Sequence, residues 1–183
     1  MLPNINSVTA RVLDALKIQL ISAPNATCCG ALRYHLNDQD GGLSNAKQNI
    51  DAWWPLVEQG VGVIVMTASS CGVMVKDYGH LLANDPIYAH KAKKISELTK
   101  DIAEILPTLQ SKLVDLIGAD QKPGVVCHPP CTLQHSQQIL GKVEGLLISL
   151  GISVRLCNDN HLCCGSAGTY SVTQPELSER SFV

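Results

Sequence analysis

Two stretches of this sequence share one pattern: residues 16–30 read LKIQLISAPNATCCG, and residues 150–165 read LGISVRLCNDNHLCCG. Each begins with an apolar segment typical of a β-strand, over 18–22 and 152–156, and continues through a polar loop to Cys-Cys-Gly. The two Cys-Cys pairs are 135 residues apart, far more than the period of a solenoid repeat. The pattern therefore predicts an internal duplication of one α/β unit.

Two further predicted strands lead to single cysteines. The apolar run over 62–66 predicts a buried strand that ends shortly before Cys71. A shorter run over 124–127 predicts a strand that ends shortly before Cys131. Because loops at the carboxyl ends of parallel strands converge, we expect the thiols of each copy to meet at one place.

Amphipathic runs between the strands predict helices that flank the sheets. Apolar residues spaced by three and four positions predict helices over 7–16, 43–59, 89–106 and 133–150. Alternating helices and strands are typical of α/β proteins with parallel sheets. We therefore expect two pseudo-repeated, Rossmann-like lobes, residues 1–118 and 124–183, with cysteine-rich loops at the carboxyl ends of the strands.

The duplication also predicts that each copy lacks a part. The second copy has a strand and Cys131 ahead of its helix, whereas the first copy starts at the helix. The first copy continues past Cys-Cys-Gly to Cys71, whereas the sequence ends before an equivalent cysteine in the second. We expect a fragment in which the first repeat is clipped N-terminally and the second C-terminally, each without one cysteine.

The composition argues against several classes of protein. The chain has 183 residues, enough for a hydrophobic core without covalent cross-links. With a formal net charge of -2 and 16% charged residues, it lacks the basic surface that nucleic acid or an anionic membrane attracts. No run approaches the roughly 18 apolar residues of a transmembrane helix, and the first residues do not resemble a signal peptide. A cytoplasmic location is expected.

The eight cysteines indicate metal or redox chemistry more than cross-linking. A secreted disulfide framework fits poorly, because no export signal is seen and a disulfide between adjacent cysteines is strained. Soft thiolates select iron–sulfur clusters, zinc or copper(I), and adjacent cysteines suit a multi-iron cluster better than one zinc ion. The alternative for each is a buried, inert cysteine. The candidate cofactor and metal ligands are Cys28, Cys29, Cys71, Cys131, Cys163 and Cys164.

Four further residues have roles that the sequence leaves open. Cys127 and Cys157 adjoin predicted strands, where packing in the core or at a sheet edge is at least as reasonable as ligation. His128 is a candidate ligand, proton donor or hydrogen-bonded structural residue, and His161 is a candidate nitrogen ligand of a zinc-type site. A zinc-binding or structural interaction domain without a redox role is therefore the alternative to an iron–sulfur protein.

Motifs of other enzyme classes are missing from the sequence. It has no G-x-G-x-x-G after a strand, no Walker loop and no convincing Ser-His-Asp arrangement, so we assign no catalytic residue. The ferredoxin run C-x2-C-x2-C-x3-C-P is also missing.

Longer motifs carry a resemblance to a known family. They are TARVL over 9–13, CCGALRYHLN over 28–37, NIDAWWP over 49–55, KDYGHLL over 76–82, HPPCTLQH over 128–135 and HLCCGSAGTY over 161–170. With these motifs, which span nearly the whole chain, the sequence resembles the cysteine-rich CCG-domain family, which includes B-type subunits of heterodisulfide reductase. Within it, the chain is most similar to the iron–sulfur subunits of glycolate oxidase (glycolate dehydrogenase).

The cysteine spacing follows the family pattern of a lone Cys, a Cys-Cys pair and a Cys-x-x-Cys, with two departures. In the second copy, 31 residues separate Cys131 from Cys163, as the pattern requires. In the first copy, 41 residues separate Cys29 from Cys71, and Met74 stands where the family has its last cysteine. The resemblance places the missing lone and final cysteines outside this sequence.

The resemblance implies a function in electron transfer. It implies [4Fe–4S]-type clusters, FAD-containing glycolate oxidase subunits as partners and an upstream ferredoxin-type domain in the same parent chain. Electrons would pass from the flavin subunit toward quinone, in a cytoplasmic complex that associates peripherally with the membrane. A lactate-utilisation subunit of the same family is the alternative.

Overall fold

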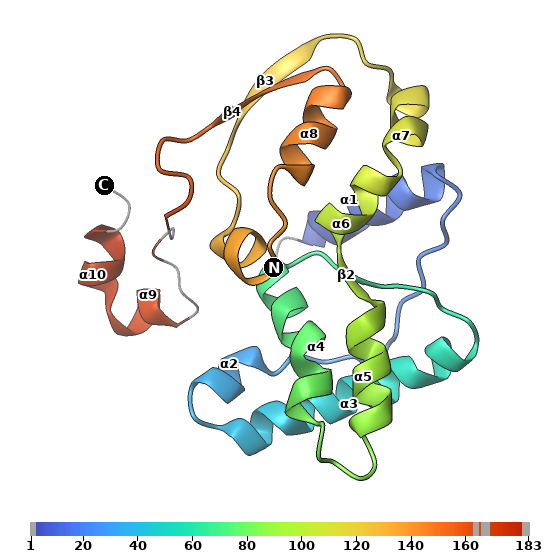
Figure 1. Ribbon diagram of the computed structural model, residues 1–183, viewed down its shortest axis with the longest axis vertical. Helices are drawn as coiled ribbons and strands as arrows, with labels where there is room; N and C mark the ends of the chain where they lie inside the picture. The colour runs from blue at the N-terminus through green and yellow to red at the C-terminus, as the bar shows by residue number, and fades with distance from the viewer. Residues whose placement is uncertain (1–2, 163–164, 166–168, 181–183) are drawn as a thin grey trace.

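The computed structural model describes residues 3–162, 165 and 169–180, and Figure 1 shows how its elements are arranged. The helices are α1 (Pro3–Ala15), α2 (Ala31–His35), α3 (Gln39–Glu58), α4 (Ser69–Leu81), α5 (Ala89–Leu98), α6 (Ile102–Thr108), α7 (Gln110–Ile117), α8 (Lys142–Ser149), α9 (Tyr170–Thr173) and α10 (Pro175–Arg180). A π-helical turn, η1, spans Thr132–Ser136. The strands are β1 (Ile64–Met66), β2 (Thr99–Asp101), β3 (Lys122–Cys127) and β4 (Ile152–Leu156).

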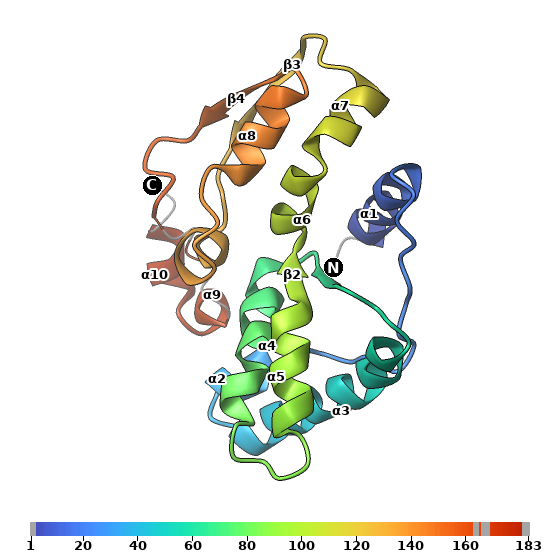
Figure 2. The same ribbon diagram turned by 45° about the vertical axis from the view of Figure 1, so that its right-hand side comes forward.

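The strands form two parallel, two-stranded sheets. β1 pairs with β2, and Val65 aligns with Lys100. β3 pairs with β4, and Val125 aligns with Val154. Each parallel pair needs a crossover, which α4 and α5 supply for the first sheet and η1 and α8 for the second. Helices flank both sheets (Figures 1 and 2), so the predicted α/β class with short parallel sheets is confirmed.

The predicted strand over 18–22 does not form. These residues have no regular secondary structure and no strand partner among the described residues. The matching strand of the second half, β4, pairs with β3, which precedes η1 and α8 in the chain. Residues 18–22 thus differ from β4 in having no neighbouring strand, among the described residues, with which to form a β-ladder.

The prediction of one continuous helix over 89–106 is wrong, because β2 separates α5 from α6. Thr99 is fully buried and its hydroxyl donates to the carbonyl of Ile95 at 2.7 Å, in the last turn of α5. Asp101 then caps α6, and the Glu104 carboxylate accepts a hydrogen bond from the Asp101 N–H at 2.8 Å. This capping box starts a new helix where the apolar spacing alone suggested continuity.

The helix predicted over 133–150 is also interrupted. It is divided into η1 and α8 by Gln138 and Gly141, which have φ angles of 54° and 68°. Both angles lie in the left-handed region, which an α-helix cannot contain. The helices predicted over 7–16 and 43–59 are confirmed as α1 and α3.

The hydrophobic core has two main centres. The first packs α3, α4 and α5 together, with fully buried side chains that include Ala46, Ile50, Val75, Tyr78, Ala92 and Ile95. The second packs the end of α1 against α7 and α8 through Leu16, Leu113, Leu146 and Leu150. The N-terminal helix therefore shares a core with α8 of the second half.

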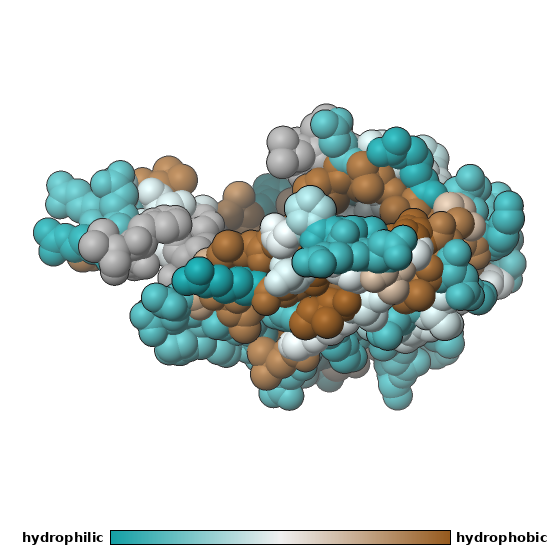
Figure 3. All heavy atoms as spheres, turned by 90° about the horizontal axis from the view of Figure 1, so that it is seen from above, coloured by the Kyte–Doolittle hydropathy of each residue, from teal (hydrophilic) through white to brown (hydrophobic). Residues whose placement is uncertain are grey.

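The end of the molecule that carries β3, β4 and α7 exposes many apolar side chains. Val126 is 69% exposed, and Ile148 on α8 is 60% exposed. Figure 3 looks onto this end and shows apolar patches between hydrophilic side chains. A membrane-spanning helix is not found in the described part of the chain, since no helix there combines the necessary length and hydrophobicity.

Candidate metal centre

The Cys28–Cys29 pair lies in the loop before α2, and two side chains from neighbouring helices hold its backbone. Asn49 on α3 accepts a hydrogen bond from the Thr27 N–H at 2.7 Å and donates to the Cys28 carbonyl at 3.0 Å. The Tyr78 hydroxyl on α4 donates to the Cys29 carbonyl at 2.8 Å. Three consecutive residues, Thr27 to Cys29, therefore have backbone groups held by side chains of α3 and α4.

Asn49 and Tyr78 are both completely buried. The Asn49 amide also donates to the Tyr78 hydroxyl at 3.2 Å, and the ring of Trp53 stacks on that of Tyr78 with centroids 6.5 Å apart. Burial raises the pKa of the Tyr78 phenol, so this hydroxyl stays protonated and remains a donor. Buried polar side chains with all their partners present have little freedom to move, which makes this a rigid support.

Glycine is required after the pair. Gly30 has a φ of 86°, and a Cβ atom at this position would lie 2.5 Å from the carbonyl oxygen of Gly42 on α3. Neither the left-handed backbone nor the close approach tolerates a side chain. Gly165, which ends the second Cys-Cys-Gly, has a similar φ of 76°. Both Cys-Cys-Gly elements therefore end in a glycine with a left-handed φ angle.

Cys71 lies in the first turn of α4, directly after β1, and its thiol is in contact with that of Cys29. The two thiols share a hydrogen bond that Cys29 donates, which together with burial raises the pKa of Cys29. Accepting that bond lowers the pKa of Cys71 to about 7. The first turn of a helix also favours a thiolate electrostatically. The structure thus brings together the elements that the sequence predicted to converge.

The sulfur atoms around Cys29 and Cys71 suit a metal centre that prefers thiolate ligands. The thiol of Cys28 hydrogen-bonds that of Cys29, and the backbone N–H of Ala31 also bonds to the Cys29 sulfur. Thiols from two elements, one with a lowered pKa, are the ligand type that iron–sulfur clusters use. Among residues 3–162, 165 and 169–180, no three Cys, His, Asp or Glu side chains are grouped closely enough to hold a single metal ion.

In the second half, Cys131 directly precedes η1, and its predicted partners Cys163 and Cys164 lie outside the described residues. The flanking structure is described. The buried hydroxyl of Ser178 on α10 donates to the carbonyl of Gly165 at 2.7 Å, which ties the end of the second Cys-Cys-Gly to the C-terminal helix.

Gln134 holds the loops around Cys131 together. Its side chain is buried in η1, and its amide donates to the carbonyls of Pro129 and Asn160, each at 2.7 Å. One loop precedes Cys131 and the other leads toward the second Cys-Cys-Gly. Gln134 therefore joins the two segments of the second half in the same way that Asn49 joins segments of the first.

The histidines near these loops have structural contacts in the described part of the chain. A ring nitrogen of His128 lies 3.4 Å from the carbonyl oxygen of Leu162, and one of His135 lies 2.9 Å from that of His161. The His128 contact agrees with the structural alternative for this residue. The His161 side chain is exposed.

Cys127 and Cys157 lie next to each other where β3 and β4 end. The Cys157 N–H donates to the Cys127 carbonyl at 3.1 Å, and both side chains are half-buried. Burial raises the pKa of the Cys127 thiol, with a smaller contribution from Glu144. These features are those of cysteines packed at a strand end, the alternative to ligation that the sequence left open.

The elements that carry Cys71 and Cys131 pack against each other. The hydroxyl of Ser69, at the start of α4, lies 2.7 Å from the hydroxyl of Thr132, at the start of η1. Cys71 follows Ser69 by two positions, and Cys131 directly precedes Thr132. The cysteine-bearing ends of the two halves are therefore adjacent.

A polar cluster fixes this junction. The Gln137 amide donates to the Ser69 carbonyl at 2.9 Å, and its oxygen accepts a hydrogen bond from the Lys76 ammonium at 2.7 Å. Lys76 also forms a salt bridge with Glu104, the residue of the α6 capping box. Burial alone would raise the pKa of Glu104, but the hydrogen bonds from Lys76 and the Asp101 N–H lower it. The cluster connects α4, α6 and η1.

Sequence reasoning gave no role to Asn49 or Tyr78, although both stand in the motifs that carry the family resemblance. The feature of the sequence that could have revealed them is a polar group on an otherwise apolar helix face. Asn49 lies at helical spacing from Ala46 and Trp53, on the apolar face of α3. A buried asparagine at such a position needs a partner for each polar atom, which predicts a hydrogen-bonded contact.

Comparison with known proteins shows which sequences this chain resembles. The family model described as a cysteine-rich domain (CCG) matches residues 1–76 and 125–182. The iron–sulfur subunit of glycolate oxidase from Escherichia coli K12 is 49% identical over 178 residues, which are 97% of this chain and 43% of that protein.

Two further relatives lie at lower identity. A probable glycolate oxidase iron–sulfur subunit from Bacillus subtilis 168 is 31% identical, over 94% of this chain and 38% of that protein. Lactate utilization protein A from Bacillus cytotoxicus is 27% identical, over 97% of this chain and 72% of that protein. The chain thus spans less than half the length of the two glycolate oxidase relatives. With both Cys-Cys-Gly elements inside the matched stretches, the chain belongs to the CCG family of cysteine-rich domains.

Proposed function

We propose that this chain is part of the electron-transfer iron–sulfur subunit of a flavin-dependent glycolate oxidase (dehydrogenase). The contact between the thiols of Cys29 and Cys71 carries the proposal, since it joins two elements that are distant in sequence at one thiol-rich place. The 49% identity to the E. coli subunit supports glycolate as the substrate of the complex. This chain supplies no group that we assign to glycolate oxidation itself.

The proposed cluster ligands fall into two sets. One comprises Cys28, Cys29 and Cys71, and the other comprises Cys131, Cys163 and Cys164. When bound, an iron–sulfur cluster supplies reversible one-electron transfer. We infer a [4Fe–4S]-type cluster, with zinc as the alternative to be tested.

The surrounding residues prepare the first set of thiols. Asn49 and Tyr78 fix the peptide units of the pair, so that the Cys28 and Cys29 thiols leave the backbone in defined directions. The Ala31 N–H bonds to the Cys29 sulfur, and such bonds raise the reduction potential of thiolate-bound centres. Trp53 and the helices behind it keep water from this support.

We further propose that the two halves are repeats of one Rossmann-like unit, residues 1–118 and 124–183. The left-handed φ angles of Gly30 and Gly165 and the matching order of helix, strand and Cys-Cys-Gly support this. The contact between the start of α4, which carries Cys71, and the start of η1, which Cys131 directly precedes, would place the two thiol sets near each other, which suits electron transfer through the subunit.

The partners follow from the same proposal. An FAD-containing glycolate oxidase subunit would donate electrons, a ferredoxin-type domain of the same parent chain would lie upstream, and quinone would be the acceptor. We place the complex in the cytoplasm, where thiols remain reduced, with peripheral attachment to the membrane. Nucleic acid is not a proposed partner.

Anaerobic reconstitution with iron and sulfide tests the proposal. The 183-residue chain should gain visible absorbance near about 400 nm and an EPR signal on reduction, as iron–sulfur proteins do. Cys71→Ala should lose iron bound by the first half, whereas Cys157→Ala, the matched control, should retain it. Binding of zinc with no iron, in this chain and in one extended at both ends, would contradict the proposal.

The identity of the organic substrate needs a separate assay. Lactate utilization relatives are 27% identical and are covered over 72% of their length, so lactate is the alternative. A complex reassembled with its flavin subunit should reduce a quinone analogue with glycolate and not with lactate. The reverse preference would reassign the complex while leaving the cluster proposal intact.

A further inference from the structure

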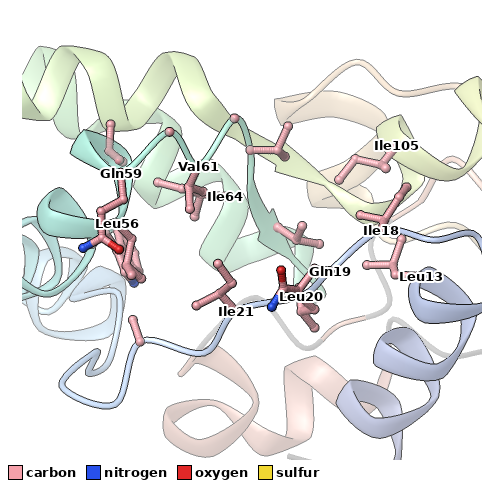
Figure 4. Close-up of a pocket in the computed structure, with 17 residues that line it drawn as sticks. Leu13, Ile18, Gln19, Leu20, Ile21, Leu56, Gln59, Val61, Ile64 and Ile105 are labelled. Atoms are coloured by element: carbon pink, nitrogen blue, oxygen red, sulfur yellow. The ribbon is translucent and has the colours of Figure 1, made fainter.

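An apolar groove lies between residues 18–23 and β1, and the proposed electron-transfer role does not account for it. Its volume is about 540 Å³. Figure 4 shows Ile18, Leu20 and Ile21 along one side of the space and Val61 and Ile64 along the other. Apolar surface left in water is unfavourable by about 25 cal/mol per Å², so a groove of this kind indicates an occupant.

One wall of the groove is β1 with the residues that lead into it, and the other is the segment 18–23, which has no regular secondary structure. β1 pairs with β2 along one edge, and no other strand pairs with it in the part of the chain that the structure describes. Residues 18–22 likewise have no strand partner there. Leu20, Ile21 and Val63 are 45%, 50% and 43% exposed. Backbone without a strand partner on both sides of an apolar space is the setting for an added β-strand.

The second half shows which strand belongs in such a place. Residues 16–20 correspond to residues 150–154, so residues 18–22 are the counterpart of β4. In the second half, β4 pairs in parallel with β3, which precedes η1 and α8 in the chain. The counterpart of β3 in the first half would precede α1 and would pair with residues 18–22.

The start of α1 lies where that strand would end. The Thr67 hydroxyl, just after β1, donates to the side-chain oxygen of Asn6 in the first turns of α1 at 3.0 Å. α1 therefore begins beside the carboxyl end of β1. A strand parallel to β1 in the groove would finish at the same edge, and a short connection would lead it into α1.

We infer that the groove receives a parallel β-strand of the same polypeptide, from sequence that precedes α1 in a longer form of the protein. The added strand would lie between residues 18–22 and β1, and it would convert two separate walls into one parallel sheet that continues to β2. Its carboxyl end would point toward Cys29 and Cys71. This chain covers 43% and 38% of its glycolate oxidase relatives, so those proteins have further sequence outside the matched stretch. The inference rests on packing and on the repeat, and it does not depend on iron binding.

The test compares two metal-free chains by hydrogen–deuterium exchange: the 183 residues alone, and the same residues with the coding sequence ahead of Met1. That sequence should contain an apolar run of about five or six residues, the usual length of a strand. In the longer chain, amides of residues 18–22 and of β1 should both exchange about tenfold or more slowly than in the shorter one. Protection of both walls together identifies a strand between them.

Two variants of the longer chain provide the controls. Val63→Lys, at a groove position, should remove the protection of residues 18–22, whereas Ile87→Lys, at a position 71% exposed and outside the groove, should retain it. Replacing the apolar run by Gly and Ser should remove it too. An upstream sequence with no apolar run, or equal exchange in both chains, would overturn the inference. Protection of the shorter chain that increases with protein concentration would also overturn the inference, because a second copy of the chain would then occupy the groove.

Discussion

The side-chain amide of Asn49 donates to the hydroxyl of Tyr78 at 3.2 Å, so the two residues that hold the Cys28–Cys29 backbone also hold each other. One comes from α3 and the other from α4, and α4 also carries Cys71. The orientation of the cysteine pair relative to Cys71 is therefore set by the packing of two helices. A loop alone would not fix it.

Tyr78→Phe should destabilise the protein by about 1–3 kcal/mol, because it leaves the partly buried Cys29 carbonyl without its donor and removes an acceptor for the buried Asn49 amide. Urea unfolding of the metal-free chain measures the loss. Tyr88→Phe is the matched control, since its hydroxyl bonds to Asp51 at the surface and should change the free energy of unfolding by less than about 0.5 kcal/mol. Equal effects of the two substitutions would show that the Tyr78 hydroxyl does not support the pair.

Gly30→Ala should cost more than Gly60→Ala, although both glycines have a positive φ. Gly60 has a φ of 97° with no atom near an added Cβ, so alanine there should cost about 1–2 kcal/mol of backbone strain. At Gly30 the added Cβ would also meet the Gly42 carbonyl at 2.5 Å, and α2 would have to move away from α3. The difference between the two variants in thermal or urea unfolding isolates this close approach. Similar losses of stability in the two variants would mean that a small movement relieves the close approach of the Gly30 Cβ to the Gly42 carbonyl.

The positions of three strands were predictable from the sequence, whereas their pairing was not. Apolar runs and the repeat predicted β1, β3 and β4, and the structure adds that β3 pairs with β4. Residues 18–22 have the same pattern as β4 but no partner among the described residues, so pattern alone could not show that they stay unpaired. At Thr99 and Asp101 the apolar spacing of a helix concealed a cap, because a capping box depends on two side chains and not on periodicity.

The sequence predicted the approach of thiols in the first half, whereas their role as ligands stays a prediction. Strand ends and spacing predicted that Cys71 would approach the first Cys-Cys pair, and its contact with Cys29 agrees. The prediction for Cys163 and Cys164 concerns residues outside the described part of the chain. The supporting residue Asn49 was missed because a polar residue on an apolar helix face indicates that a partner exists, but not which segment supplies that partner.

Glu104→Gln should lower stability at neutral pH and change its dependence on acid. The folded pKa of Glu104 lies below its ordinary 4.5, so its contribution is complete above that pH and is lost as the pH falls through the lowered value. The wild type should exceed the variant by about 1–2 kcal/mol at pH 7, since the carboxylate receives a charge-assisted hydrogen bond from partly buried Lys76. The difference should shrink below pH 4.5 in urea titrations.

Glu97→Gln is the control for that experiment, because Glu97 lies on α5, outside the polar cluster that joins α4, α6 and η1. It should leave the free energy of unfolding unchanged within about 0.5 kcal/mol across the same pH range. A constant gap between wild type and Glu104→Gln from pH 7 to pH 3 would instead assign the effect to the neutral hydrogen bonds of the capping box.

Cys29→Ala should raise the pKa of Cys71 from about 7 toward the ordinary thiol value of 9.0, because the Cys71 thiolate loses the hydrogen bond that stabilises it. Alkylation of the metal-free chain with iodoacetamide, followed by peptide mass spectrometry, reports this pKa from the rate at each pH. At pH 7 the variant should react at Cys71 about tenfold more slowly, since the thiolate is the nucleophile.

Cys127→Ala is the matched control for this prediction, because Cys127 lies at the end of β3, beside Cys157 and away from the Cys29–Cys71 contact. In the Cys127→Ala variant, Cys71 should keep the wild-type dependence of alkylation rate on pH. An unchanged profile in Cys29→Ala would mean that the start of α4, and not the second thiol, lowers the pKa of Cys71. The thiols of Cys29 and Cys71 would then titrate independently, and their contact would no longer support a shared cluster site.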